Sequence, residues 1–371
     1  MSRSVDALFR PFTLNGLRLP NRVVMAPMTR WKSPGGIPGP DVAAYYRRRA
    51  ENECGLIITE GTTVDHPVAS YSQRVPAFHG EALAGWKRVV DEVHRAGGRI
   101  MPQLWHVGIS RRPGQDYVNR DQPSFSPSGL FLPNKNPVAA PATRAEIHAV
   151  IQSFAVAARE ARELGFDGIE VHGAHGYAFD QFFWSPINRR DDEYGGSLEN
   201  RTRFAVETIQ AMRREVGDDY PLVLRISQWK EQDYSAKLAH GPEELQAFLR
   251  ILADAGVDAF HCSQRRYWQE EFEGSALNLA GWAKRLSGKP AIAVGSVGLS
   301  GELMTRGVQA LGHYAETAGI DALLEKLEHD EFDLVAIGRA LLADPAWARK
   351  VHEQRFDELL PYSNAALEEL F

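Results

Sequence analysis

The sequence has very little cysteine, since only Cys54 and Cys262 occur among its 371 residues. Two isolated thiols outside any Cys-x-x-Cys motif cannot build a disulfide framework, and they cannot hold an iron–sulfur cluster alone. We therefore expect both to be small buried residues of a protein in a reducing compartment.

Long apolar runs and blocks of like charge are also missing. No stretch of about 18 or more apolar residues occurs, and the N-terminal segment lacks the apolar core and cleavage site of a signal peptide. Basic residues number 42 and acidic residues 48, giving a formal net charge of −6. Nothing in this balance favours nucleic acid or an anionic membrane as partner. The sequence predicts a soluble, cytoplasmic protein.

Neither common nucleotide-binding fingerprint is present. A doubly wound dinucleotide-binding domain would place G-x-G-x-x-G after its first strand, but here that strand runs into Ala26-Pro27-Met28-Thr29-Arg30. A G-x-x-x-x-G-K-[ST] loop is absent as well. These absences count against an open α/β sheet that binds a dinucleotide and against one that binds a nucleoside triphosphate through a phosphate-binding loop.

What is present is an alternation of short Val/Ile/Leu/Ala-rich segments with longer segments of helical period. Apolar residues recur at helical spacing in the intervening segments, and Thr143 and Glu146 form a capping box before one of them. The expected strands are residues 21–28, 55–61, 99–106, 168–174, 221–227, 259–264, 291–297 and 333–341. Eight such units predict one (β/α)8 barrel domain over residues 1–371, with its active site on the loops that follow the strands.

Three segments fall outside this alternation. Leu14-Asn15-Gly16-Leu17 has a hairpin turn signal and is expected to cap the barrel floor. Residues 107–141 and 298–317 form long loops after the third and seventh strands. Loops of that length are usually lids or binding loops.

The end of the fourth strand carries the densest polar cluster. His172 and His175 can both donate N–H bonds to one substrate oxygen, and the phenol of Tyr177 can supply a proton. The same histidines, as His-x-x-His, are also two candidate ligands for a metal-dependent barrel hydrolase. A pair of structural histidines at a strand end is the third interpretation.

Basic and small residues mark other strand ends. Arg225 lies inside an apolar strand, where it either faces an anionic ligand or pairs with Glu170 or Glu60. Gly295-Ser296 and Gly338-Arg339 end the last two strands, where barrels often bind phosphate.

Aromatic residues, among them Trp105 and Trp268, are plentiful near the expected mouth. They could line a pocket for a flat ligand, although core packing is the commoner role for any one of them.

Taken together in order, these motifs resemble the old yellow enzyme family of FMN-dependent ene-reductases. The matching stretches are Ala26–Arg30, Gln103–His106, His172–Tyr177, the Ser185-Pro186-x-Asn188-x-Arg190 to Asn200-Arg201 segment, and Ile337-Gly338-Arg339. The resemblance implies FMN bound at the top of one barrel. It also implies NADPH or NADH as hydride donor and an electron-poor alkene as the small-molecule substrate.

The resemblance also implies a role for each matching residue. His172 and His175 would hold the substrate oxygen, Tyr177 would protonate the α carbon, and Trp105 would shape the substrate pocket. Trp268, one of the aromatic residues near the expected mouth, is also expected in that pocket, although the resemblance does not assign it. The residues expected to hold FMN are Ala26, Pro27, Met28 and Gly61 through backbone groups, Thr29 at flavin O4, Gln103 at the pyrimidine edge, Arg225 at N1–O2, and Gly295, Ser296, Gly338 and Arg339 at the phosphate.

Two features depart from the family pattern. Many members have Asn where this chain has His175, which leaves ligand preference open. Residues 265–282 and 298–317 are not recognisable family features and are expected to adjust substrate choice. A non-catalytic flavin-binding barrel, in which Tyr177 is only a pocket wall, remains an alternative to the ene-reductase and to the hydrolase.

Overall fold

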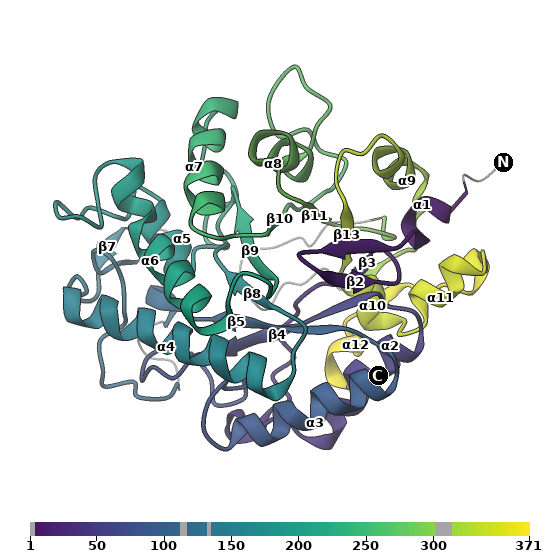
Figure 1. The fold of residues 1–371 in the computed structure, drawn as a ribbon, viewed down its shortest axis with the longest axis horizontal. Helices are drawn as coiled ribbons and strands as arrows, with labels where there is room; N and C mark the ends of the chain where they lie inside the picture. Colours follow the sequence, from purple (N-terminus) through teal and green to yellow (C-terminus); the bar gives the residue numbers. More distant parts are fainter. Residues whose placement is uncertain (1–3, 112–116, 132–134, 301–313) are drawn as a thin grey trace.

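A closed barrel of eight parallel strands forms the centre of the computed structural model, which describes residues 4–111, 117–131, 135–300 and 314–371 (Figure 1). The strands are β3 (Val23–Met25), β4 (Leu56–Thr63), β5 (Ile100–Trp105), β8 (Ile169–His172), β9 (Leu222–Ser227), β10 (Ala259–Ser263), β11 (Ala291–Val294) and β13 (Leu334–Ile337). They follow one another around the barrel in chain order, and β13 closes it by pairing with β3, Val335 opposite Val23. The predicted (β/α)8 barrel is confirmed.

Helices follow the strands and surround the barrel (Figure 1). The principal ones are α2 (Pro40–Glu51), α3 (Ala82–Arg95), α4 (Arg144–Leu164), α6 (Leu198–Val216), α7 (Pro242–Asp254), α8 (Leu279–Ser287), α9 (Asp321–Glu328) and α11 (Trp347–His352). Short ones are α1 (Asp6–Phe9), α5 (Ala178–Phe183), α10 (Arg339–Ala343), α12 (Ala365–Glu368) and the 3-10 turns Pro34–Gly36, Gly108–Ser110 and Phe356–Glu358. The capping box at the start of α4 forms as predicted, with reciprocal bonds between Thr143 and Glu146.

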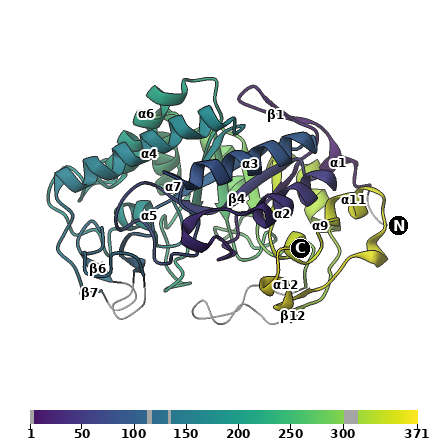
Figure 2. The same ribbon diagram turned by 90° about the horizontal axis from the view of Figure 1, so that it is seen from below.

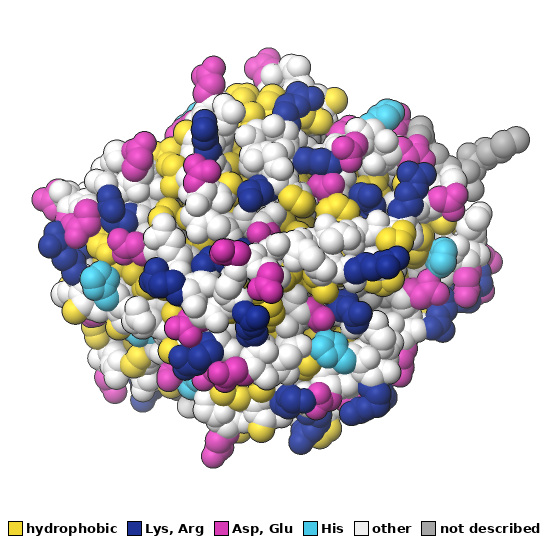
Figure 3. Space-filling model, in the orientation of Figure 1, with side chains coloured by type: hydrophobic (Ala, Val, Ile, Leu, Met, Phe, Trp, Pro, Cys, Tyr) yellow, Lys and Arg dark blue, Asp and Glu magenta, His cyan; other side chains and the backbone are white. Residues whose placement is uncertain are grey.

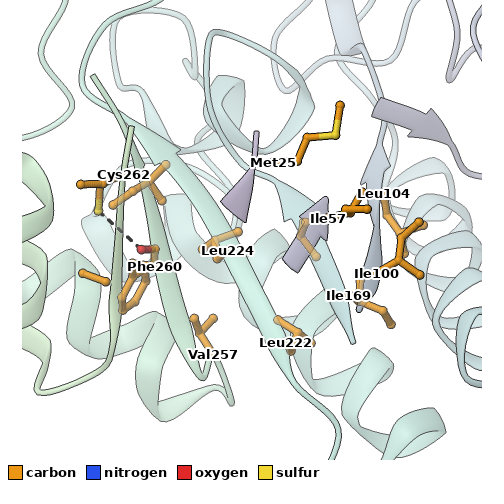
Figure 4. Close-up of a cluster of buried hydrophobic side chains, with 14 of the residues drawn as sticks. Met25, Ile57, Ile100, Leu104, Ile169, Leu222, Leu224, Val257, Phe260 and Cys262 are labelled. Atoms are coloured by element: carbon orange, nitrogen blue, oxygen red, sulfur yellow. Dashed lines mark hydrogen bonds between the residues drawn. The ribbon is translucent and has the colours of Figure 1, made fainter. Parts of the chain in front are cut away.

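The strands are buried on both faces, which explains their nearly continuous apolar sequence. Successive residues point to opposite sides, so Ile58 and Val223 belong to the cluster inside the barrel, whereas Ile57 and Leu224 belong to the cluster beneath the helices. Figure 4 shows part of the outer cluster, including Ile57, Leu222 and Leu224.

The N-terminal hairpin plugs one end of the barrel. Strands β1 (Phe12–Leu14) and β2 (Leu17–Leu19) pair antiparallel across Asn15 and Gly16, whose φ angles of 40° and 80° match the predicted tight turn. Leu14 and Leu19 are fully buried and belong to the cluster inside the barrel. The hairpin thus closes the floor and leaves the carboxyl ends of the strands as the open end.

Both predicted long loops are present in the described chain, although residues 112–116, 132–134 and 301–313 lie outside it. The loop after β5 contains a small hairpin of β6 (Leu130–Phe131) and β7 (Asn136–Pro137) (Figure 2). The loop after β11 returns through β12 (Tyr314–Ala315), which pairs with β14 (Tyr362–Ser363) near the C-terminus.

The expected last strand, residues 333–341, is too long. The strand ends at Ile337 because Gly338 turns the chain with φ −100° and ψ −100°, and α10 begins at Arg339.

Two further observations concern the surface and membranes. Basic and acidic side chains are interspersed over the face in Figure 3. Within the described ranges, no helix is long and apolar enough to cross a membrane.

Candidate functional site

A cavity of about 310 Å³ opens at the carboxyl ends of the barrel strands. Of the sixteen residues to which the sequence assigns a site role, fourteen line it: Ala26, Pro27, Met28, Thr29, Gln103, Trp105, His172, His175, Tyr177, Arg225, Gly295, Ser296, Gly338 and Arg339. These residues come from six strand ends that are up to about 300 positions apart in sequence, because parallel strands bring their carboxyl ends to one rim.

Two of the sixteen do not line the cavity. Gly61 lies within β4 behind Trp105, and a Cβ built there would stand 2.5 Å from Trp105 Cε3. Its missing side chain therefore makes room for the indole instead of exposing backbone to a ligand.

Trp268 is the other exception. Its neighbour Tyr267 turns inward, donating its backbone N–H to Gly295 O, and is 5% exposed. Trp268 consequently faces outward, 44% exposed, and packs edge-on against Tyr267.

His172, His175 and Tyr177 form one ring cluster. The ring centroid of His172 lies 5.1 Å from that of His175 and 4.9 Å from that of Tyr177, both nearly perpendicular. Burial lowers the pKa of both histidines well below the usual value, and the Arg225 cation lowers it further. Both imidazoles are therefore neutral at pH 7 and act as hydrogen-bonding groups.

Local contacts fix the orientation of His175. Its φ of 65° is rare for a residue with a side chain, and its N–H donates to Ser227 Oγ at 2.9 Å. The ring stacks on Trp229 with centroids 4.4 Å apart, and Nε2 lies 2.7 Å from Ser263 Oγ. If the serine hydroxyl donates to Nε2, the ring proton is on Nδ1. No motif or spacing in the sequence points to Ser263 or Trp229.

Arg225 lies on β9 and is 7% exposed. Neither carboxylate considered from the sequence pairs with it. Glu170 instead bonds Gln103 Nε2 at 2.7 Å and His261 Nδ1 at 2.6 Å, and Glu60 accepts the backbone N–H of Arg30 at 2.8 Å. Among the residues described, Arg225 makes no ion pair, and its buried Nε has no hydrogen-bond partner. The cavity floor thus carries a positive charge.

Small residues and a second arginine form the far side of the cavity. Arg339 Nη2 donates to Ser296 Oγ at 3.3 Å, which joins the ends of β11 and β13. Gly295 has a φ of 143°, and a Cβ there would lie 2.7 Å from Gln264 O. Only glycine fits at this point, because of its φ angle and because a side chain would collide with the backbone of the loop after β10.

Sequence reasoning missed a carboxylate on the cavity wall. Tyr177 Oη donates to Glu231 Oε1 at 2.9 Å, and both residues line the cavity.

A metal site is not evident: within the described residues, no group of three or more His, Cys, Asp or Glu side chains could hold an ion. The hydrolase alternative thus lacks a ligand set in that part of the chain.

Comparisons with known proteins place this architecture in a family. The model of the NADH:flavin oxidoreductase / NADH oxidase family matches residues 7–358. The chain is 34% identical over 360 residues to 12-oxophytodienoate reductase 7 from Oryza sativa subsp. japonica, covering 91% of this chain and 86% of that protein.

Two solved structures are similar across nearly the whole chain. Morphinone reductase in complex with tetrahydroNAD has a TM-score of 0.77 and 27% identity, over 97% of this chain and 93% of that one. The Old Yellow Enzyme from Pichia sp. AKU4542 has a TM-score of 0.79 and 25% identity, over 97% and 90%. The chain therefore belongs to the NADH:flavin oxidoreductase / NADH oxidase family, within its old yellow enzyme group, and is an NAD(P)H-dependent flavin oxidoreductase that uses FMN.

Proposed function

We propose that this protein reduces the activated C=C bond of α,β-unsaturated carbonyl or nitro compounds, with Tyr177 as proton donor. The observation that carries the proposal is the cluster of two neutral histidines and one phenol in a cavity that also holds Arg225, which makes no ion pair with any residue that the structure describes. The histidines can bind an uncharged or weakly basic oxygen, and the phenol is the acid beside them.

The cavity residues fit FMN. In the described part of the chain, the buried Nε of Arg225 has no hydrogen-bond partner, and the flavin N1–C2=O edge would offer it an acceptor. Glu170 engages the amide nitrogen of Gln103 and leaves the amide oxygen to accept from flavin N3–H. Thr29 and the backbone of Ala26, Pro27 and Met28 would line the ring, and Gly295, Ser296, Gly338 and Arg339 would hold the phosphate. When bound, FMN accepts hydride from NADPH or NADH and passes it to the substrate β carbon.

The chain's own residues perform the rest of the step. His172 Nδ1 accepts the N–H of Ala174 at 3.4 Å, so Nε2 carries the proton that His172 donates to the substrate oxygen. His175 donates the second hydrogen bond. These bonds draw electrons from the alkene and stabilise negative charge on the oxygen, after which Tyr177 gives its phenolic proton to the α carbon.

The proposal covers the whole chain, 1–371, as one FMN-binding domain with a small electrophilic alkene as substrate. Arg265 lines the cavity, which supports a role for the segment 265–282 in substrate choice. For the segment 298–317, the support is Leu299, which also lines the cavity; residues 301–313 lie outside the described chain.

The test begins with the visible spectrum of the purified protein and identification of the flavin that heat releases. Tyr177→Phe is then expected to slow reoxidation of the reduced flavin by an alkene such as 2-cyclohexenone by about 10²- to 10⁴-fold, while flavin reduction by NADPH stays unchanged. Equal rates in both half-reactions for variant and wild type would overturn the assignment of Tyr177. A protein that neither contains nor takes up FMN would overturn the whole proposal.

A further inference from the structure

A carboxylate touches the group that we propose as proton donor. The phenolic oxygen of Tyr177 donates to Glu231 Oε1 at 2.9 Å, and Glu231 is half-buried on the cavity wall. The reduction step described above does not use Glu231. A negatively charged carboxylate next to a phenol makes it harder for the phenol to lose its proton.

The backbone fixes Glu231 in this position. The loop after β9 pairs with the loop after β8 through a parallel bridge between Lys230 and His175, and the Glu231 N–H donates to His175 O at 3.2 Å. Glu231 is therefore attached to the same short segment that carries Tyr177.

A buried ion pair locks the two loops together. Lys230 Nζ and Asp180 Oδ1 are 2.7 Å apart, and neither side chain has any solvent exposure. The other oxygen of Asp180 accepts the backbone N–H of Gly176 at 2.7 Å. Because Gly176 precedes Tyr177 and Lys230 precedes Glu231, one buried pair sets the relative position of phenol and carboxylate.

We propose that Glu231 is a positioning residue for Tyr177, which keeps the phenol protonated and in place so that it can donate to the substrate at alkaline as well as neutral pH. This inference rests on the proposed function. In the step, the Tyr177 O–H bond breaks as a C–H bond forms at the α carbon, and Tyr177 then regains a proton from solvent. Glu231 acts on the phenol through its negative charge, which disfavours the phenolate.

Other groups around the pair set the balance that Glu231 shifts. The cation of Arg225, on β9, interacts with Tyr177 and favours the phenolate. The His172 ring, on β8, is neutral and packs against the phenol. The charge of Glu231 also reaches Tyr71, in the loop after β4, while Arg265, in the loop after β10, lines the same wall. Without the Glu231 charge, Arg225 acts on the phenol with less opposition.

The experiment compares Glu231→Gln with wild-type holoenzyme in the two half-reactions across pH. Glutamine keeps the length and an acceptor oxygen but removes the charge. The alkaline limb of alkene reduction is expected to move down by about one pH unit or more, so that the rate near the wild-type limb falls about tenfold. At pH 6 to 7, the rate should stay within about threefold, and flavin reduction and FMN affinity should be unchanged. Glu243→Gln, an exposed carboxylate in the first turn of α7, is the matched control and should leave the profile unchanged.

Two further variants separate the outcomes. Glu231→Asp keeps the charge and should keep the alkaline limb near its wild-type position, which a loss of folding would not mimic. In a Tyr177→Phe background, Glu231→Gln should no longer alter the pH profile. If Tyr177→Phe slows alkene reduction but Glu231→Gln leaves the profile unmoved, the inference is wrong and the proposed function stands. If Glu231→Gln has the same effect with and without the phenol, Glu231 acts by another route and the inference is again wrong. If Tyr177→Phe changes nothing, the proposed function itself fails.

Discussion

Removing one partner of the buried Lys230–Asp180 pair should be costly. Asp180→Asn keeps the shape of the side chain and an oxygen for the Gly176 N–H. Among the residues that the structure describes, it leaves the Lys230 ammonium with the carbonyl of Gln228, 3.1 Å away, as its remaining acceptor. Unpaired buried charges of this kind destabilise by about 3–5 kcal/mol. That loss is a large part of the total stability of an ordinary protein.

The loss should depend on pH in a defined direction. Burial lowers the pKa of Lys230, and the charge of Asp180 opposes this effect. Without Asp180, the folded-state pKa falls further below the unfolded value, so the unfolded chain binds more protons in the interval between them. Stability of the variant therefore rises with pH in that interval. The gap to wild type should narrow as pH increases from 7 toward 10.

Urea unfolding at pH 7 and pH 9.5, with saturating FMN in all samples, measures both effects. Asp330→Asn is the control. Asp330 also pairs with a lysine, Lys284, but its side chain is 78% exposed, and an exposed pair contributes about 0–1 kcal/mol. A loss below about 1 kcal/mol for Asp180→Asn, or an equal gap at both pH values, would refute the reasoning.

Three other substitutions test separate parts of the site. Arg225→Gln should weaken FMN binding to the apoprotein by at least about tenfold, since a hydrogen bond to a charged group is worth about 1.5–3 kcal/mol; fluorescence titration measures this, and unchanged affinity would contradict it. Gly61→Ala should destabilise by about 1–3 kcal/mol in urea unfolding, because its Cβ would meet Trp105 at 2.5 Å; wild-type stability would mean that the indole lies elsewhere. Glu60→Gln should remove a pH dependence of stability: burial raises the pKa of Glu60 from 4.5 to about 7, so wild type loses up to about 3 kcal/mol as pH rises through this range. Unfolding free energies at pH 5 and pH 8 should show that slope in wild type and not in the variant.

Much of the fold could be predicted because its signals are local. Strands buried on both faces read as unbroken apolar runs, as in β9, and helices with one buried face repeat their apolar residues every three or four positions, as in α4. Asn15-Gly16 predicts its tight turn because Asn and Gly readily adopt the positive φ angles that such a turn requires. Once eight such units are recognised, barrel closure brings the strand ends to one rim, and this is why most predicted site residues line one cavity.

The errors lie where a single backbone angle or a distant contact decides the outcome. Tyr267 and Trp268 are adjacent aromatics, and the turn after β10 buries the first and exposes the second. Glu231 was missed because its contact with Tyr177 spans 54 positions and depends on two loops pairing outside regular secondary structure. No periodicity marks such a contact.

The two ends of the barrel divide stability and chemistry between them. At the floor, Leu14 and Leu19 pack into the inner apolar cluster, and the positive φ of Asn15 falls at a tight turn outside that cluster. At the open end, Trp31, His175 and Ser296 line the cavity with positive φ angles of 52°, 65° and 53°, conformations that cost non-glycine residues of order 1–2 kcal/mol each. Such strain persists only where surrounding contacts over-determine the backbone, as the Ser227 bond and the Lys230 bridge do for His175. The same loop pairing that strains His175 also places Glu231 against Tyr177, so the strained backbone is part of what aligns the reactive side chains.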